Sequence, residues 1–424
     1  MAESPASHGQ SDHLLPASGA RRVGGRRLSI CYVVPGHDLV LSSGPTRNVL
    51  NLARELSRWA DVTVAFRQRI DATDALGFNV VEIQPRQRAE GADDSAMRGI
   101  GYGDFLSYLK AIRRFAHHEL GPFDVVLEKS WLISGYVSAL CRRRGQLGVP
   151  VENIVQNPAH AASGQMAKLV RMHVAGWLAG RAIRGAPLII AETEFLRKEI
   201  AAYWRVPLER IAVVDLGVDR KLFHPIDQGA AREACGLPQE ATLLMYIGVL
   251  DRTHNLEPAI RAVGASADAG IELHVVGDGV RRAEYESLAA SSRARVVFHG
   301  KVEHERVPWF IAAADLCLAP YDSAAFSSGE LGYSTMKIPE YLSVGRAVVS
   351  VPSGRIRTLV KDGETGFLFA NEPEGWARFL RALPSRDRLR EMGESAAASK
   401  LTSWEDTALG YLSLCESALA AKGH

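Results

Sequence analysis

The most unusual residues of this chain stand at the start of one predicted helix, in the stretch GYSTMKIPEYLSVGRAVVSVPSG, residues 332–354. Pro339 has no N–H and is tolerated only in the first turn of a helix, so this helix must begin near Thr335 or Met336. The free amides around residues 334–338, together with the positive end of the helix dipole, would form a site for an anion.

A cation and a carboxylate accompany these amides. Lys337 is unfavourable in the first turn of an empty helix by a few tenths of a kcal/mol, and a bound phosphate would reverse that sign. Glu340 follows about one turn deeper, where its carboxylate is placed to accept hydrogen bonds from a vicinal diol. With amides from Ser334 and Thr335, this pattern predicts a site for a nucleoside diphosphate. The alternative is an ordinary helix with a surface lysine and a capping glutamate.

Two further loops place cations and glycines at the ends of predicted strands. In YIGVLDRTHNLEPAIRAV a strand ends at Gly248, and Arg252 and His254 follow where they can meet phosphate oxygens. In SSGPTRNVLNL, Gly44 lets its backbone approach a ligand because no Cβ intervenes, and Arg47 lies in the first turn of the next helix. Either segment is also compatible with an ordinary charged loop.

Several catalytic motifs are missing from the sequence. It contains no D-x-D, no G-x-x-x-x-G-K-[ST], no complete G-x-G-x-x-G, no H-E-x-x-H and no G-x-S-x-G. His117 and His118 are expected to be solvated on a helix rather than to bind a metal. We therefore expect no metal site and no resident cofactor.

Length and composition indicate a two-domain globular protein. The chain has 424 residues, 47% of them hydrophobic and 23% charged. A formal net charge of +2 argues against nucleic acid as a partner. The five cysteines are scattered singly, which is typical of a reducing compartment. No apolar run reaches the roughly 18 residues of a membrane span, so we expect a cytoplasmic protein.

The elements that position these loops alternate between short β-branched runs and longer amphipathic stretches, which is the pattern of βα units around parallel sheets. We expect strands at LSICYVV, VTVAF, VVEI, DVVLE, ENIVQ and LIIAE in the first half, and at TLLMYIGVL, ELHVVGDG, RVVFHG, LCLAPY, AVVSVP and GFLF in the second. A hinge near residues 220–230 would separate two Rossmann-like domains that face each other across a cleft.

The order of segments resembles the family 4 retaining glycosyltransferases, which have the GT-B fold, from residue 28 to 420. LIIAETEFLRKEIAAYWRVPLERIAVVDLGVDRKLFHP is similar to the family's strand–helix–strand run into its interdomain motif. VVGDGVRRAEYESLA, VVFHGKVEHERVPWFIAAADLCLAP and KIPEYLSVGRAVVSVPSGRIRTLVKDGETGFLF follow in the family's order. The final SWEDTALGYLSLCESAL resembles the C-terminal helix that crosses back onto the N-terminal domain.

The resemblance implies an α/β chain of two Rossmann-like parallel-sheet domains. After a flexible tail of residues 1–27, we place an acceptor-side domain at 28–222, joined by the C-terminal helix 403–424. A nucleotide-sugar-binding domain would cover 223–402.

The family's motifs imply roles for single residues. Glu340 matches the second carboxylate of the E-x7-E motif, which holds the donor ribose, and Gly44 matches the glycine-rich first loop. Gly248 opens the counterpart of the phosphate loop G-R-L-x-x-x-K-G, in which Val249 and His254 replace the family's arginine and lysine.

The sequence offers a substitute for one of these replaced residues, and it departs from the family pattern at two further points. Arg252 is the expected substitute for the missing arginine of the phosphate loop. The first carboxylate of E-x7-E falls at Gly332, which puts sugar selection in doubt, and Glu330 is the candidate replacement. The family's central histidine is replaced, and His160 is the candidate on the acceptor side.

The resemblance implies transfer of a hexosyl group from a nucleoside diphosphate sugar, first of all a UDP-sugar, to an acceptor hydroxyl with retention at the anomeric carbon. Arg252, Lys337 and His160 are the expected catalytic residues. The acceptor would be a natural-product aglycone or a glycan or lipid-linked sugar. The missing motif residues leave two alternatives: an inactive GT-B binding or regulatory protein, and another GT-B enzyme such as a nucleotide-sugar epimerase or pseudo-glycosyltransferase.

One helix leaves the location open. AKLVRMHVAGWLAGRAIRGA, with Trp177, is basic and amphipathic and could lie on the inner face of an anionic membrane. We favour packing of its apolar face on the sheet. The choice between a monomer and a homodimer also stays open.

Overall fold

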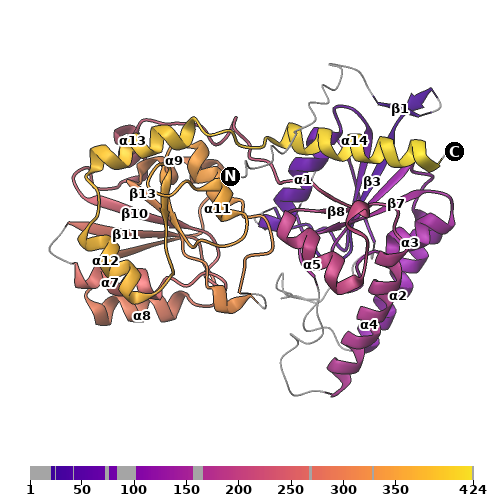
Figure 1. The fold of residues 1–424 in the computed structure, drawn as a ribbon, viewed down its shortest axis with the longest axis horizontal. Coiled ribbons are helices and arrows are strands. Elements are labelled where there is room, and N and C mark those ends of the chain that lie inside the picture. The colour runs from indigo at the N-terminus through magenta and orange to yellow at the C-terminus, as the bar shows by residue number, and fades with distance from the viewer. Residues whose placement is uncertain are drawn as a thin grey trace, which may run out of the picture.

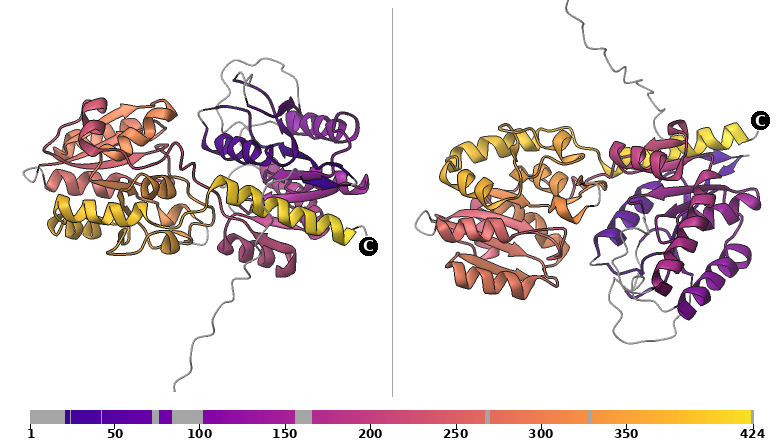
Figure 2. Two further views of the ribbon diagram at one scale, coloured as in Figure 1. Left: turned by 90° about the horizontal axis from the view of Figure 1, so that it is seen from above. Right: turned by 60° about the horizontal axis from the view of Figure 1, so that its bottom comes forward.

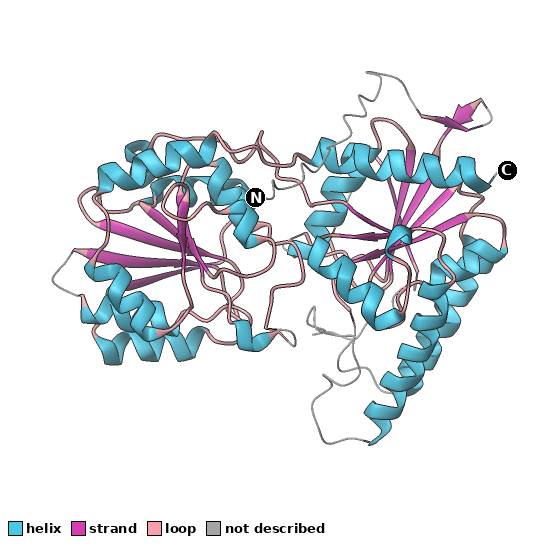
Figure 3. Ribbon diagram, in the orientation of Figure 1, coloured by secondary structure: helices cyan, strands magenta, loops and turns pink. Residues whose placement is uncertain are grey.

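The computed structural model describes residues 21–23, 25–41, 43–71, 76–83, 102–155, 166–266, 270–326 and 329–422. Two parallel sheets, each covered by helices on both faces, form two separate bodies (Figure 1, Figure 3). A short antiparallel hairpin of β1 (Arg22–Val23) and β2 (Arg26–Arg27) precedes them. The predicted α/β class with two Rossmann-like domains is confirmed.

The first sheet has seven parallel strands in the order β5-β4-β3-β6-β7-β8-β9. The strands are β3 (Ser29–Val34), β4 (Asp61–Phe66), β5 (Asn79–Glu82), β6 (Val125–Lys129), β7 (Leu147–Glu152), β8 (Ile189–Ala191) and β9 (Ile211–Val213). The helices are α1 (Gly44–Leu56), α2 (Tyr102–Arg114), the π-helix η2 (Phe115–Glu119), α3 (Tyr136–Arg143), α4 (Met166–Arg184), α5 (Glu194–Trp204) and the 3-10 turn η4 (Leu208–Arg210). We call this sheet and its helices the N-terminal domain.

The alternation of side chains along the strands produces a core on each face of this sheet. Ile30 and Tyr32 on β3 face the cluster that α1 completes, whereas Cys31 and Val33 face the cluster beneath α2, α3, α4 and α5. Because helices cover both faces, the strands read as nearly continuous hydrophobic runs.

One strand prediction was wrong. A strand was expected at ENIVQ, residues 152–156. The observed strand, β7, lies earlier in the chain and ends at Glu152. The sequence pattern did not indicate β7 because it contains Gly148 and Pro150, and both residue types usually interrupt strands. Gly148 is required because a Cβ there would lie 2.2 Å from the carbonyl oxygen of Ser138. Pro150 is tolerated because β8 pairs with β7 only from Val151 onward.

The second sheet has six parallel strands in the order β12-β11-β10-β13-β14-β15. The strands are β10 (Thr242–Ile247), β11 (Ile271–Val276), β12 (Val296–Gly300), β13 (Leu316–Ala319), β14 (Ala347–Ser350) and β15 (Gly366–Leu368). The helices are α6 (Gln228–Cys235), α7 (Glu257–Ala265), α8 (Arg282–Ser292), η6 (His304–Arg306), α9 (Val307–Ala313), η7 (Ser323–Ala325), α10 (Lys337–Ser343), α11 (Ile356–Leu359), α12 (Pro373–Arg381) and α13 (Arg386–Ala397). We call this sheet and its helices the C-terminal domain.

The last helix, α14 (Trp404–Lys422), crosses back to the N-terminal domain, as predicted. Both views of Figure 2 show it along that domain, and Trp404, Tyr411 and Leu412 join the core cluster of α1. The chain therefore passes between the domains twice. The two passages are bridged at Val218 and Ser403, and the Val218 N–H donates to the carbonyl of Thr402 at 2.9 Å.

The predicted boundary between residues 222 and 223 falls between β9 and α6, and the division of roles between the domains stays a prediction. In α4, Ala175, Ala179 and Ile183 are buried against the sheet, while Trp177 is 62% exposed. Among the described helices, none is both long and apolar enough to span a membrane.

Candidate active site

Helix α10 begins at Lys337, directly after its N-cap residue Met336, which makes no capping hydrogen bond with its side chain. Pro339 lies in the first turn, as its missing N–H requires. The buried face of the helix consists of Ile338, Tyr341 and Leu342. This packing leaves Lys337 and Glu340, three residues apart, on the partly exposed side.

Aromatic rings enclose the ammonium group of Lys337. Its Nζ lies 4.4 Å from the ring centre of Tyr246 and 5.6 Å from that of Tyr321, and it donates to the Tyr246 hydroxyl at 3.3 Å. Burial lowers the pKa of Lys337 to about 7, although the charges of Asp251 and Glu340 oppose this effect. An anion that enters here would meet a cation already largely stripped of water.

Glu340 belongs to a cluster of charges that both domains supply. Burial raises the pKa of Glu340 to about 8, and the positive charges of Lys337 and Arg47 act against that rise. Arg47 comes from α1 in the N-terminal domain. Burial therefore favours the protonated carboxyl group, which can both donate and accept hydrogen bonds with a diol.

Gly248 makes room for the lysine. Its φ is +148°, a conformation that L side chains rarely adopt. A Cβ at this position would lie 2.8 Å from Nζ of Lys337. The glycine after β10 therefore allows the ammonium group to approach the backbone of the loop that follows this strand.

His254 is neutral at physiological pH. Burial and the charge of Lys337 lower the pKa of His254 to about 4. Its Nδ1 lies 2.9 Å from Oδ1 of Asp251 and 3.0 Å from Oγ1 of Thr253. The carboxylate favours the tautomer with the proton on Nδ1, which leaves Nε2 as a hydrogen-bond acceptor. His254 therefore does not supply the positive charge of the lysine it replaces.

The remaining predicted residues lie in different surroundings. Ser334 and Thr335 are buried, and the hydroxyl of Thr335 is hydrogen-bonded to that of Tyr321. Arg252 and Gly44 are exposed, and a Cβ at Gly44 would meet no atom within 4 Å. Their roles stay predictions. His160 lies outside the described residues.

Glu330 is engaged by the protein itself. Its carboxylate accepts two hydrogen bonds from the Arg357 guanidinium, at 2.9 and 3.1 Å, and one from the Gly354 N–H at 2.6 Å. Arg357 is the main cause that lowers the pKa of Glu330 to about 2. To replace the missing carboxylate at Gly332, Glu330 would have to leave these partners.

Gly332 faces the N-terminal domain. A Cβ there would lie 3.2 Å from Oε2 of Glu199 and 3.6 Å from Cδ1 of Phe195, both on α5. The position at which the family carries a carboxylate is therefore a point of contact between the two domains in this chain.

Sequence reasoning missed the aromatic enclosure of Lys337 and the partner of His254. Tyr246 lies on β10 and Tyr321 follows β13, far apart in sequence, and only the pairing of these two strands brings them together. Asp251 carried a usable signal, since it precedes His254 by three residues in the same loop. In the described parts of the chain, no group of three or more metal-ligating residues could hold an ion.

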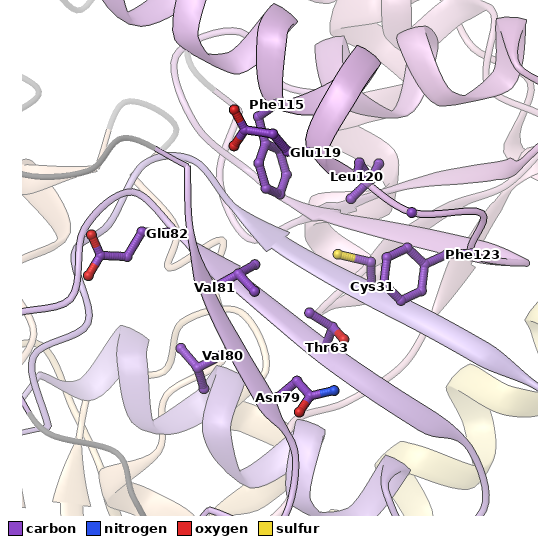
Figure 4. A pocket seen from close by; sticks show the side chains of 11 residues that line it. Cys31, Thr63, Asn79, Val80, Val81, Glu82, Phe115, Glu119, Leu120 and Phe123 are labelled. Carbon is purple, nitrogen blue, oxygen red and sulfur yellow. The ribbon is translucent and has the colours of Figure 1, made fainter.

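A hollow of about 430 Å³ lies away from these residues, on the N-terminal domain (Figure 4). It is formed between β5 and the segment around η2, with Cys31 and Thr63 from the sheet and Phe115 and Phe123 among its lining residues. No predicted site residue lines it.

Comparison with known proteins assigns the family. Residues 43–217 match the model of the glycosyl transferase 4-like domain, and residues 241–385 match that of glycosyl transferases group 1. A D-inositol 3-phosphate glycosyltransferase of Nocardioides is 28% identical over 356 residues, which is 75% of each chain. A protein of the same name from Xylanimonas cellulosilytica is 27% identical over 387 residues, 86% of this chain and 89% of that one.

Solved structures share the fold. Sucrose-phosphate synthase from Thermosynechococcus elongatus superposes with a TM-score of 0.73 at 19% identity, over 93% of this chain and 100% of that one. Anabaena HepE in complex with UDP and glucose gives 0.69 at 17% identity, over 92% and 100%. The chain therefore belongs to the GT-B glycosyltransferases that combine a glycosyl transferase 4-like domain with a group 1 glycosyl transferase domain.

Proposed function

We propose that the protein transfers a hexosyl group from a nucleoside diphosphate sugar to an acceptor hydroxyl, with retention at the anomeric carbon and without a metal ion. One observation carries the proposal: the desolvated ammonium group of Lys337 lies beside Glu340 at the edge where the two domains meet. Anabaena HepE has been solved with UDP and with UDP-glucose, so a UDP-sugar is the donor to test first.

In this proposal Lys337 stabilises the negative charge that develops on the leaving diphosphate. The aromatic enclosure excludes water, so the charge interaction is stronger than in solution. Glu340 binds the ribose diol and fixes the nucleotide relative to Lys337. Arg252, at the exposed rim of the phosphate loop, would reach the diphosphate from the other side. The departing phosphate takes the acceptor proton.

The acceptor is proposed from the curated relatives. Two proteins named D-inositol 3-phosphate glycosyltransferase match most of this chain at 27–28% identity. A phosphorylated polyol is therefore the first acceptor to test, ahead of natural-product aglycones and lipid-linked sugars. We assign acceptor binding to residues 28–222 with helix 403–424, and donor binding to residues 223–402.

A thermal-shift screen tests the donor site directly. The purified protein is heated with UDP, GDP, dTDP, ADP or CMP, each with and without magnesium. A ligand at about 100 times its dissociation constant should stabilise the folded state by about 2.7 kcal/mol. We expect one diphosphate to stabilise the protein equally well with and without magnesium.

Two substitutions at Glu340 sharpen this screen. Glu340→Ala should abolish the selective stabilisation, whereas Glu340→Gln, which keeps a donor and an acceptor for the diol, should retain part of it. Stabilisation that is unchanged in Glu340→Ala would place the nucleotide elsewhere. No stabilisation of the wild type by any of these nucleotides would contradict the proposed function.

A further inference from the structure

The N-terminal domain holds the loop that leads into α10. Oγ1 of Thr193 donates to the carbonyl of Gly332 at 2.6 Å. Nζ of Lys129 lies 3.6 Å from the carboxylate of Glu192, the residue before Thr193, and the backbone N–H of Ser334 acts to lower the pKa of that carboxyl group against the rise that burial causes. Glu192 and Thr193 directly follow β8, so the segment after this strand of the N-terminal domain contacts the loop before α10 of the C-terminal domain.

Arg355, a partly buried arginine, reinforces this contact from the C-terminal domain. Nη2 of Arg355 lies 2.9 Å from the carboxylate of Asp215, in the first passage between the domains. Nη1 of Arg355 donates to the hydroxyl of Ser334 at 2.8 Å. Ser334 is thus held through its side chain by Arg355. We call these contacts, formed by Thr193, Asp215, Gly332, Ser334 and Arg355, the clasp.

Further contacts with the N-terminal domain lie at both ends of the loop. Met336, the N-cap residue of α10, packs against the core cluster of the N-terminal domain. Gly332 lies against Phe195 and Glu199 of α5, with no space for a larger residue unless these side chains move. Gly332 and Met336, at the two ends of the loop before Lys337, therefore contact the N-terminal domain, although they belong to the C-terminal domain.

Thr193 is suited to this role because its hydroxyl makes two hydrogen bonds, one to the first turn of α5 and one to the loop before α10. It caps α5 by accepting the N–H of Leu196 at 3.1 Å. A hydroxyl has one proton and two lone pairs, so the cap leaves its proton for Gly332. An aspartate could cap α5 equally well, but it has no proton to donate to the carbonyl of Gly332.

We propose that Thr193 is a positioning residue of the transfer reaction, which fixes the loop 332–336 and thereby the placement of Lys337 and Glu340 at the donor. This inference rests on the proposed function of Lys337 and Glu340. Thr193 need not touch the reacting atoms. Because the clasp joins the domains, a donor that requires the placed lysine binds more tightly to the molecule in which the clasp is formed.

Matched substitutions at Thr193 test the clasp with UDP as the probe, by isothermal titration calorimetry on the full chain. Thr193→Ser keeps the cap and the donated hydrogen bond, so its dissociation constant should stay within about threefold of the wild type. Thr193→Asp keeps only the cap and sets a carboxylate against a carbonyl. It should weaken UDP binding about tenfold or more. Melting temperatures without nucleotide show whether both variants are folded.

A second variant provides an independent test in case Thr193→Asp does not fold. Asp215→Asn preserves the size of the residue and removes the charge that Arg355 faces, and it should weaken UDP binding at least threefold. Wild-type affinity in folded Thr193→Asp and Asp215→Asn would overturn the clasp and leave the donor site intact. A wild type that binds neither UDP nor GDP, dTDP or ADP would overturn the proposed function and the clasp with it.

Discussion

Lys337 is expected to bind the nucleotide and, as a desolvated charge, to lower the stability of the domain that contains it. We expect Lys337→Met to raise the melting temperature of the ligand-free protein and to abolish its affinity for nucleoside diphosphates. Methionine is flexible and apolar, so the space between Tyr246 and Tyr321 stays filled while the desolvated charge is removed.

The structure provides the magnitude. Burial lowers the pKa of Lys337 from its ordinary value of 10.5 to about 7. At about 1.36 kcal/mol per pH unit, the folded chain disfavours the ammonium group by about 5 kcal/mol relative to the unfolded chain. The lost attraction to the ring of Tyr246 offsets about 2 kcal/mol of this. A net gain of about 2–3 kcal/mol corresponds to a rise of about 4–12 °C for a domain of this size.

The sign of the pH dependence follows from the same value. Between about pH 7 and pH 10.5 the unfolded chain keeps a proton on Lys337 that the folded chain has released. Raising the pH through this window increases the free energy of unfolding of the wild type. The difference in stability between the wild type and Lys337→Met therefore becomes smaller. Lys337→Arg, which cannot release its proton, should be less stable than the wild type throughout.

Denaturant unfolding of the three proteins at about pH 7 and about pH 9.5 measures these differences, and UDP titration measures the loss of binding. Two results would refute the reasoning. One is a Lys337→Met variant no more stable than the wild type at pH 7. The other is a stability difference that does not change between the two pH values.

Two other substitutions have clear expectations. Glu330→Gln removes a carboxylate whose pKa Arg357 lowers to about 2, so it should lower stability at pH 7. That stabilisation is present above about pH 4.5 and is lost as the pH falls towards 2, so unfolding at pH 7 and pH 3 checks it; an altered donor preference would contradict a purely structural role. Gly248→Ala brings a Cβ to 2.8 Å from Nζ of Lys337 and should weaken UDP binding about tenfold. Gly121→Ala, where the nearest atom lies 3.7 Å away, is its control, and equal affinity in both would show that the lysine does not need this space.

Hydrophobic patterning predicted the fold because both sheets are parallel and buried on both faces. Eleven of the twelve expected strands overlap their observed counterparts by most of their length, as LSICYVV does with β3 and AVVSVP with β14. The exception is β7. Its Gly148 and Pro150 are explained by the close approach of α3 and by the late pairing with β8, and both are tertiary facts that no local pattern contains.

The site was predictable where the chemistry is local to one segment. Lys337, Pro339 and Glu340 define their helix turn from sequence alone, and the structure places them there. What could not be predicted depends on contacts between segments far apart in the chain. Glu330 was expected to be available for the donor, and its pairing with Arg357, 27 residues later, became visible only in three dimensions.

The two passages between the domains determine how these domains can move. At Val218 and Ser403 they run parallel and are hydrogen-bonded, and Gly217 allows a contact so close that a Cβ would lie 2.3 Å from the backbone nitrogen of Trp404. A single connecting segment would allow the domains to rotate about several axes. Two hydrogen-bonded segments resist twisting and allow bending mainly about one axis. The domains should therefore open and close by a hinge motion about one axis, so that each closure forms the same hydrogen bond between Thr193 and Gly332.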